Sequence, residues 1–175
     1  FEGYKNIAKY IESKYNIKFL NTYNFLKNRF LEVGRINLFN DMISYFELDE
    51  NELSSTLELL RTFKPKHKFH LFPIMKIFLC EIETTETDYV IITNGNVQQQ
   101  KNKVEHILWG KLNPKIVYAN LFKPKPYPDS FLDYLSKQNK NYKRGKVLLI
   151  GDNEIDNEFA KNIKCKFMNV KSILK

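Results

Sequence analysis

Residues 147–156 read Val-Leu-Leu-Ile-Gly-Asp-Asn-Glu-Ile-Asp, and this segment decides the fold class of the chain. A short apolar run that ends at a glycine is typical of a parallel strand covered on both faces. Two carboxylates, Asp152 and Asp156, follow the strand, at the edge where α/β proteins bind ligands. Mg²⁺ prefers oxygen ligands and is usually bound by one or two protein carboxylates. For this segment alone, the simpler explanation of an ordinary acidic helix start stays open.

Strands and helices alternate throughout the second half of the chain. The patterns predict strands at residues 89–92, 116–118 and 146–150, and helices at residues 74–79, 97–108, 129–137 and 154–162. This alternation predicts an α/β fold, with a parallel sheet between two layers of helices. Right-handed crossovers then bring the ends of the strands, at Ile92, Ala119 and Ile150, to one edge of the sheet.

The first half of the chain has a different pattern. Up to about residue 60 the apolar residues recur at helical spacing, as in Tyr4, Ile7, Ala8 and Ile11, without strand alternation. A later helix begins near Asp49 or Asn51, and Pro65 prevents it from continuing. We therefore expect this half to be all-helical.

Composition limits the possible classes of protein. A chain of 175 residues forms one domain, or one domain with an inserted lid. It contains no apolar run of membrane-spanning length, and residues 1–10 lack the apolar core of a signal peptide. We therefore expect a cytoplasmic protein without a membrane partner. The two cysteines are far apart, which indicates neither a disulfide framework nor a zinc site.

The formal net charge of +8 raises the question of nucleic acid. Basic residues gather only in a short loop at residues 64–68, and the other lysines are scattered among acids. No basic helix face or recognition motif is present. We expect a solvated basic surface and no nucleic-acid partner.

Two further segments end at the predicted sheet edge. Residues 89–95 form an apolar strand that ends in Thr93, Asn94 and Gly95, a turn able to aim a hydroxyl and backbone N–H groups at an anion. Residues 123–129 hold Lys125 between prolines, so the lysine loses less entropy when it pairs with an anion. A capped strand end and a proline-rich loop are the simpler explanations. The conjunction of all three segments at one edge favours a site.

With these motifs the second half resembles the haloacid dehalogenase-like hydrolase superfamily, in the branch with a helical cap inserted after the first strand. Members end one strand in Thr or Ser, which Thr93 matches. A second family motif is a Lys in a Lys-Pro-x-Pro-Asp-like string, which Lys125 fits best and Lys123 fits in part. A third is Gly-Asp-x-x-x-Asp, which includes Asp152 and Asp156.

The resemblance implies a fold and a division of the chain. Residues 69–175 would form a Rossmann-like, three-layer parallel-sheet core, and residues 1–68 an all-helical cap subdomain that closes over the site and selects the substrate. It also implies site residues. Asp152 would bind Mg²⁺ directly. Asp156 would contact the ion through a water molecule, or would orient the groups that bind it directly. The implied phosphate ligands, of which Thr93 and Lys125 are also catalytic, are Thr93, Asn94, Gly95 and Lys125.

One family motif is absent from the 175 residues. The first strand of the family ends in Asp-x-Asp, which supplies the nucleophile, and this chain has no such sequence. Asp41 lies in a helical segment and Asp49 has no strand before it, so neither is a candidate nucleophile. In the family the missing strand lies between those that end at Thr93 and Asp152. We expect roughly 10 to 20 further residues upstream of Phe1, enough for one strand and its turn.

For the complete protein the resemblance implies a Mg²⁺-dependent hydrolase of small phosphomonoesters that works through an aspartyl phosphate. Its partner would be a small phosphorylated metabolite. A phosphotransferase on the same fold and a non-catalytic binding or scaffold protein remain as alternatives. The sequence does not reveal the identity of the substrate or the oligomeric state.

Overall fold

The computed structural model describes residues 1–139, 141–142 and 145–174. Two compact units divide the chain, the N-terminal unit Phe1–Lys66 and the C-terminal unit His67–Lys175. Each unit has its own hydrophobic cluster. No helix in the described ranges is long and apolar enough to cross a membrane.

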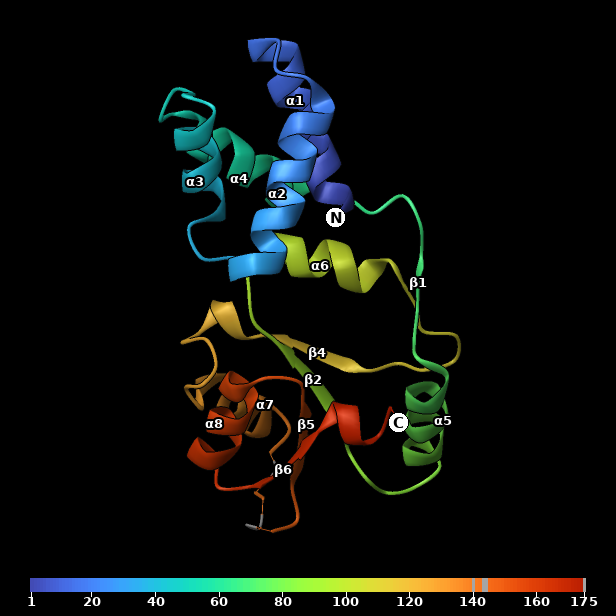
Figure 1. Cartoon of the computed structure of the whole chain (residues 1–175). Coiled ribbons are helices and arrows are strands. Elements are labelled where there is room, and N and C mark those ends of the chain that lie inside the picture. The colour runs from blue at the N-terminus through green and yellow to red at the C-terminus, as the bar shows by residue number, and fades with distance from the viewer. Residues whose placement is uncertain (140, 143–144, 175) are drawn as a thin grey trace. The chain divides into compact units, whose positions relative to one another are not determined.

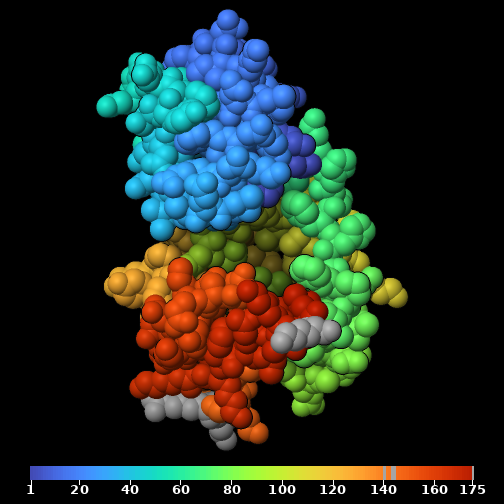
Figure 2. Space-filling model, in the orientation of Figure 1, coloured from blue at the N-terminus to red at the C-terminus, as the bar shows by residue number. Residues whose placement is uncertain are grey.

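The N-terminal unit consists of four helices: α1 (Glu2–Tyr15), α2 (Phe19–Val33), α3 (Leu38–Tyr45) and α4 (Glu52–Thr62). The prediction of an all-helical first half is confirmed (Figure 1). Helix α1 packs against α2 and α4, and α3 packs against the same two helices. In the space-filling view their atoms, blue to cyan, form one continuous body (Figure 2).

The core of the N-terminal unit follows from helical periodicity. Ile7, Ala8 and Ile11 lie on one face of α1 and are completely buried. Leu26 of α2 and Met42 of α3 are buried against the same cluster. These apolar side chains give the unit a core that does not depend on the rest of the chain.

A buried carboxylate lies in this helical unit. The Glu52 side chain, 3% exposed, accepts hydrogen bonds from Lys14 Nζ at 2.6 Å and from Tyr15 OH at 3.0 Å. Burial raises the pKa of the Glu52 carboxyl, but the hydrogen bonds from Lys14, Tyr10 and Tyr15 and the charge of Lys14 outweigh it, so the net shift is downward. The ionised form of Glu52 therefore stabilises the folded helices.

This pKa shift makes the stability of the N-terminal unit depend on pH. Because the folded-state pKa of Glu52 lies below its ordinary value of 4.5, its stabilising contribution is present above that pH. The contribution disappears as the pH falls through the folded-state pKa. We expect Lys14→Met to lower the thermal midpoint near neutral pH by roughly 5 °C, because it leaves a buried carboxylate short of its cation. The difference from wild type should shrink at about pH 3.

The matched control is Lys161→Met, which breaks the exposed pair between Lys161 and Glu154 at 3.8 Å. That pair is solvated, so its loss should leave the midpoint unchanged. Thermal unfolding followed by the helical circular dichroism signal makes both measurements. Equal shifts for the two lysine variants would contradict the assignment.

The C-terminal unit alternates strands and helices. Its helices are α5 (Pro73–Glu83), α6 (Val97–Glu105), α7 (Asp129–Lys137) and α8 (Glu154–Asn162). Its strands are β1 (Phe69–His70), β2 (Val90–Thr93), β3 (Ile107–Leu108), β4 (Lys115–Tyr118), β5 (Leu148–Gly151) and β6 (Lys166–Asn169). Two short 3₁₀ helices, η1 (Ala119–Leu121) and η2 (Val170–Ser172), follow β4 and β6. The α/β class with a Rossmann-like core and a helical cap is confirmed.

All strand pairs in this unit are parallel. β2 pairs with β4, β5 with β6, and the short β1 with β3. Figure 1 shows β2 and β4 side by side. Within the described residues no ladder joins β2 to β5, so each of these strands keeps one unpaired edge. The parallel strands thus form separate pairs rather than the continuous sheet that alternation predicts.

Several element boundaries differ from the sequence prediction. The helix predicted at residues 97–108 ends at Glu105, because residues 107–108 leave it to pair with β1. The pattern did not predict β1, β3 or β6. The first two contain only two residues each, too short to show a period.

One apolar cluster holds β2 and β5 together in spite of the missing ladder. Phe131 of α7 and Phe159 of α8 are its buried centre, and Ile92 of β2 and Leu149 of β5 pack against it. The helices therefore cover one face of both strands. This packing brings the carboxyl ends of β2 and β5 to the same region, where the candidate site lies.

Candidate functional site

The end of β2 carries the first predicted site residues. Thr93 is the last residue of β2, and its hydroxyl donates to Gln100 Oε1 at 3.0 Å. Gly95 has a φ of 116°, a conformation that favours glycine. Its N–H donates to Asn120 Oδ1 at 2.7 Å. The hydroxyl and the N–H that the sequence assigned to an anion thus each have a protein acceptor.

Asn94 makes two hydrogen bonds to the backbone of one residue, Lys125. Asn94 Oδ1 accepts from the Lys125 N–H at 2.9 Å, and Asn94 Nδ2 donates to the Lys125 carbonyl at 3.0 Å. Both polar ends of the amide are used in this pair. The loop of Lys125 is therefore joined directly to the end of β2.

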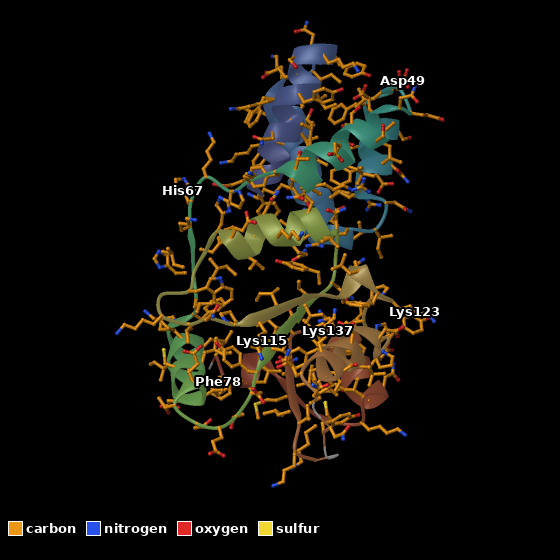
Figure 3. The ribbon with its side chains drawn as sticks, turned by 180° about the vertical axis from the view of Figure 1, so that it is seen from behind. Asp49, His67, Phe78, Lys115, Lys123 and Lys137 are labelled. Carbon is orange, nitrogen blue, oxygen red and sulfur yellow. The ribbon has the colours of Figure 1, made fainter. Side chains whose placement is uncertain are left out.

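The side chain of Lys125 contacts the acidic motif after β5. Its Nζ lies 2.5 Å from Asp156 Oδ1, and the two side chains are only 13% and 7% exposed. Lys123, the other candidate, is exposed and lies over the Tyr127 ring at 5.6 Å. Figure 3 shows Lys123 on the outside of its loop. Of the two lysines, Lys125 is the one that joins the acidic motif.

The turn after β5 holds Asp152 and Asp156. Asn153 caps α8 by accepting the Asp156 N–H at 3.0 Å. Asp156 then lies in the first helical turn, where the helix dipole favours a carboxylate. Its Oδ2 accepts the backbone N–H of Asp152 at 3.2 Å. The buried acid thus pairs with Lys125 and also orients the residue beside it.

Asp152 differs from Asp156 in its surroundings. Its side chain is exposed, and Asn153 Nδ2 donates to its Oδ1 at 2.8 Å. Within the described ranges, no three His, Cys, Asp or Glu side chains come together as a metal cluster. Asp152 offers an accessible carboxylate at this edge. One carboxylate fits Mg²⁺, which often completes its coordination with water and substrate phosphate.

The early aspartates serve the N-terminal unit. Asp41 Oδ2 accepts from Arg29 Nε at 2.7 Å, which links α3 to α2. Asp49, labelled in Figure 3, accepts the Asn51 N–H at 2.8 Å at the start of α4. Each acid has a local structural role.

Sequence reasoning missed three amide side chains around the site. Asn120 follows the end of β4, so the rule of polar residues at strand ends could have indicated it. Gln100 lies in α6 and reaches back to Thr93, and Asn162 at the end of α8 donates to the Pro126 carbonyl at 2.8 Å. Nothing in the local pattern indicates these two contacts.

The sequence profile of the haloacid dehalogenase-like hydrolase family matches residues 5–170. The chain belongs to this family. A similar solved structure is that of a protein from Lactobacillus delbrueckii subsp. bulgaricus, provisionally named a phosphoglycolate phosphatase. It is 16% identical with a TM-score of 0.61, over 96% of this chain and 79% of that one. At this identity the likeness shows the fold. No curated protein sequence matches the chain.

Gly151 is required by the close approach of α8 to β5. A Cβ at this position would lie 2.4 Å from Asp156 Cβ and 2.6 Å from Asp156 Oδ2. We expect Gly151→Ala to destabilise the C-terminal unit by about 2 kcal/mol, because the start of α8 must move. Urea unfolding measures this change.

Gly110→Ala is the matched control. Gly110 has a φ of 67°, and a Cβ added there would meet no atom within 4 Å, so its replacement costs only backbone strain of about 1 kcal/mol. Gly151→Ala should additionally displace the resonances of Asp156 and Lys125 in NMR spectra. A Gly151→Ala protein with unchanged stability would contradict the steric argument.

Proposed function

We propose that the complete protein hydrolyses small phosphomonoesters in a Mg²⁺-dependent reaction that passes through an aspartyl phosphate. The observation that carries the proposal is the buried ion pair between Lys125 and Asp156, beside the accessible carboxylate of Asp152. It combines a fixed cation, for a phosphoryl group, with an acid that can hold a metal. Membership of a hydrolase family supports the same class of reaction.

Lys125 would neutralise charge on the phosphoryl group. An ammonium has three N–H donors, and the contact with Asp156 uses one of them. The other two can contact phosphoryl oxygens. Because the side chain is mostly buried, its charge is less screened by water than that of a surface lysine. Asp156 keeps the ammonium in place between turnovers.

Thr93 and Gly95 would hold phosphoryl oxygens at the end of β2. The Thr93 hydroxyl can rotate from Gln100 towards an incoming oxygen. The Gly95 N–H would exchange Asn120 Oδ1 for a phosphoryl oxygen, one acceptor for another. In this proposal the Gly95 N–H keeps its direction because it belongs to the backbone, and only the Thr93 hydroxyl has to reorient.

Asp152 would hold Mg²⁺. When bound, the ion would polarise phosphoryl oxygens and reduce the repulsion between the phosphate and an attacking carboxylate. Asp156 would support this role through its hydrogen bond to the Asp152 backbone N–H. The substrate would be a small phosphorylated metabolite of the cytoplasm.

The nucleophilic aspartate would come from a strand N-terminal to residue 1. The unpaired edges of β2 and β5 support this part of the proposal, because both strands lack a partner there among the described residues. A parallel strand between them would satisfy both rows of backbone groups. An acid at its carboxyl end would then lie between Thr93 and Asp152.

The test is release of inorganic phosphate from small phosphomonoesters by the full-length protein, with and without Mg²⁺. We expect Asp152→Asn to lower kcat/KM by about 1,000-fold without changing the fold, because the ion loses its charged ligand. The matched control is Glu154→Gln in the same turn. Glu154 is exposed and pairs weakly with Lys161, so activity should stay within about twofold of wild type.

Three results would contradict the proposal. Full activity of Asp152→Asn would exclude the assigned metal ligand. A full-length protein that has an Asp-x-Asp strand but releases no phosphate would exclude the reaction. A full-length protein without any aspartate ahead of Phe1 would favour a non-catalytic binding role.

A further inference from the structure

The side-chain amide of Asn94 is bonded to the backbone of Lys125 through both its oxygen and its nitrogen. Its oxygen accepts the Lys125 N–H at 2.9 Å, and its nitrogen donates to the Lys125 carbonyl at 3.0 Å. These two bonds use one of the two N–H donors of the amide and fix the direction of the whole group. The sequence assigned phosphoryl oxygens to the backbone around Asn94, so this side-chain contact is a separate role of the same residue.

The pair of hydrogen bonds restrains Lys125 at its α-carbon. Bonds on both sides of one residue close a ring, as in a bridge between strands, and fix the position and direction of that residue. The far end of the same side chain is held by Asp156 at 2.5 Å. Lys125 is thus restrained at both ends, by β2 on one side and by α8 on the other.

Asn94 also follows Thr93 directly in the chain. The residue that ends β2 and the residue that holds the lysine loop are therefore connected by a single peptide bond. This connection sets the spacing between the Thr93 hydroxyl and the Lys125 backbone. Two groups proposed to contact the same phosphoryl group share one rigid support.

We propose that Asn94 is a positioning residue, which acts on the reaction only through Lys125 by setting where the ammonium meets the phosphoryl group. This inference rests on the proposed function for its catalytic consequence. The physical reason for an asparagine is that the contact needs one donor and one acceptor at fixed separation. Aspartate offers acceptors only, and glutamine is longer by one methylene group.

A double-mutant cycle tests the dependence on Lys125. Asn94→Ala should lower kcat/KM by about 100-fold, the scale of a misplacement of about 1 Å at a catalytic group. The double variant Asn94→Ala/Lys125→Met should be no worse than Lys125→Met alone, because Asn94 has nothing left to position. Additive losses would overturn the proposal, since they would mean that Asn94 contacts the substrate itself.

Asn162→Ala is the matched control, because Asn162 ties the same loop at the next residue, Pro126. It removes one amide-to-backbone bond and leaves both bonds of Asn94 in place. Its loss in kcat/KM should be about tenfold smaller than that of Asn94→Ala. Equal losses would show that the loop needs only general tethering, and would overturn the specific role of Asn94.

A spectroscopic measurement makes the contact testable without turnover. In protein labelled with ¹⁵N-lysine, the paired and mostly buried ammonium of Lys125 should exchange slowly and give its own signal, absent from Lys125→Met. Asn94→Ala should lose this signal and Asn162→Ala should keep it. A signal that persists in Asn94→Ala would overturn the proposal.

The two readouts separate the two proposals. The wild-type protein could show the Lys125 signal, and Asn94→Ala could lose it, while no phosphate is released. That result would support the contact between Asn94 and Lys125 and would contradict the proposed phosphatase activity. If Asn94→Ala does not fold, the isosteric Asn94→Asp serves instead. It keeps the bond from the Lys125 N–H and loses the bond to the carbonyl, so its loss of signal should be partial.

Discussion

The ion pair between Lys125 and Asp156 is the interaction on which the organisation of the core depends. Lys125 is joined to β2 through Asn94, and Asp156 lies in the first turn of α8, which follows β5. The pair therefore links two strands that share no ladder among the described residues. A buried ion pair contributes little net stability, because desolvation offsets its attraction. Its value here is geometric, since it holds a cation and an acidic turn in one place.

The ion pair is stable in this buried position because the polar groups of Asp156 all have hydrogen-bond partners. Asp156 receives the ammonium at one oxygen and the Asp152 N–H at the other, and its own N–H is accepted by Asn153. Beneath it, Phe131 and Phe159 pack with Ile92 and Leu149 into one apolar cluster. Polar contacts at the strand ends and apolar contacts in the cluster thus both connect β2 with β5, which share no ladder among the described residues. The N-terminal unit needs none of this, because its helices bury a separate core.

Sequence reasoning succeeded where a local pattern carries the information. Helices α7 and α8 occupy the predicted residues, since the apolar periodicity of each helix can be read along the chain. It failed where pairing decides the structure. Residues 107–108 were predicted as helix but pair with β1, and β6 was not predicted at all. Both depend on strand partners that are remote in the sequence. At the site, the motifs indicated Thr93, Lys125, Asp152 and Asp156, but nothing in the local spacing indicated the side-chain contacts of Gln100 and Asn162.

By itself the sequence determined the α/β class, the helical first half and the family, because these depend on residue type and period along the chain. Only the tertiary structure decided that Lys125 rather than Lys123 meets Asp156, and that the side chain of Asn94 bonds to the backbone of Lys125. Both outcomes depend on which loop lies against which strand end. Such distances between remote residues are set by packing and hydrogen bonding in three dimensions, and local spacing does not encode them.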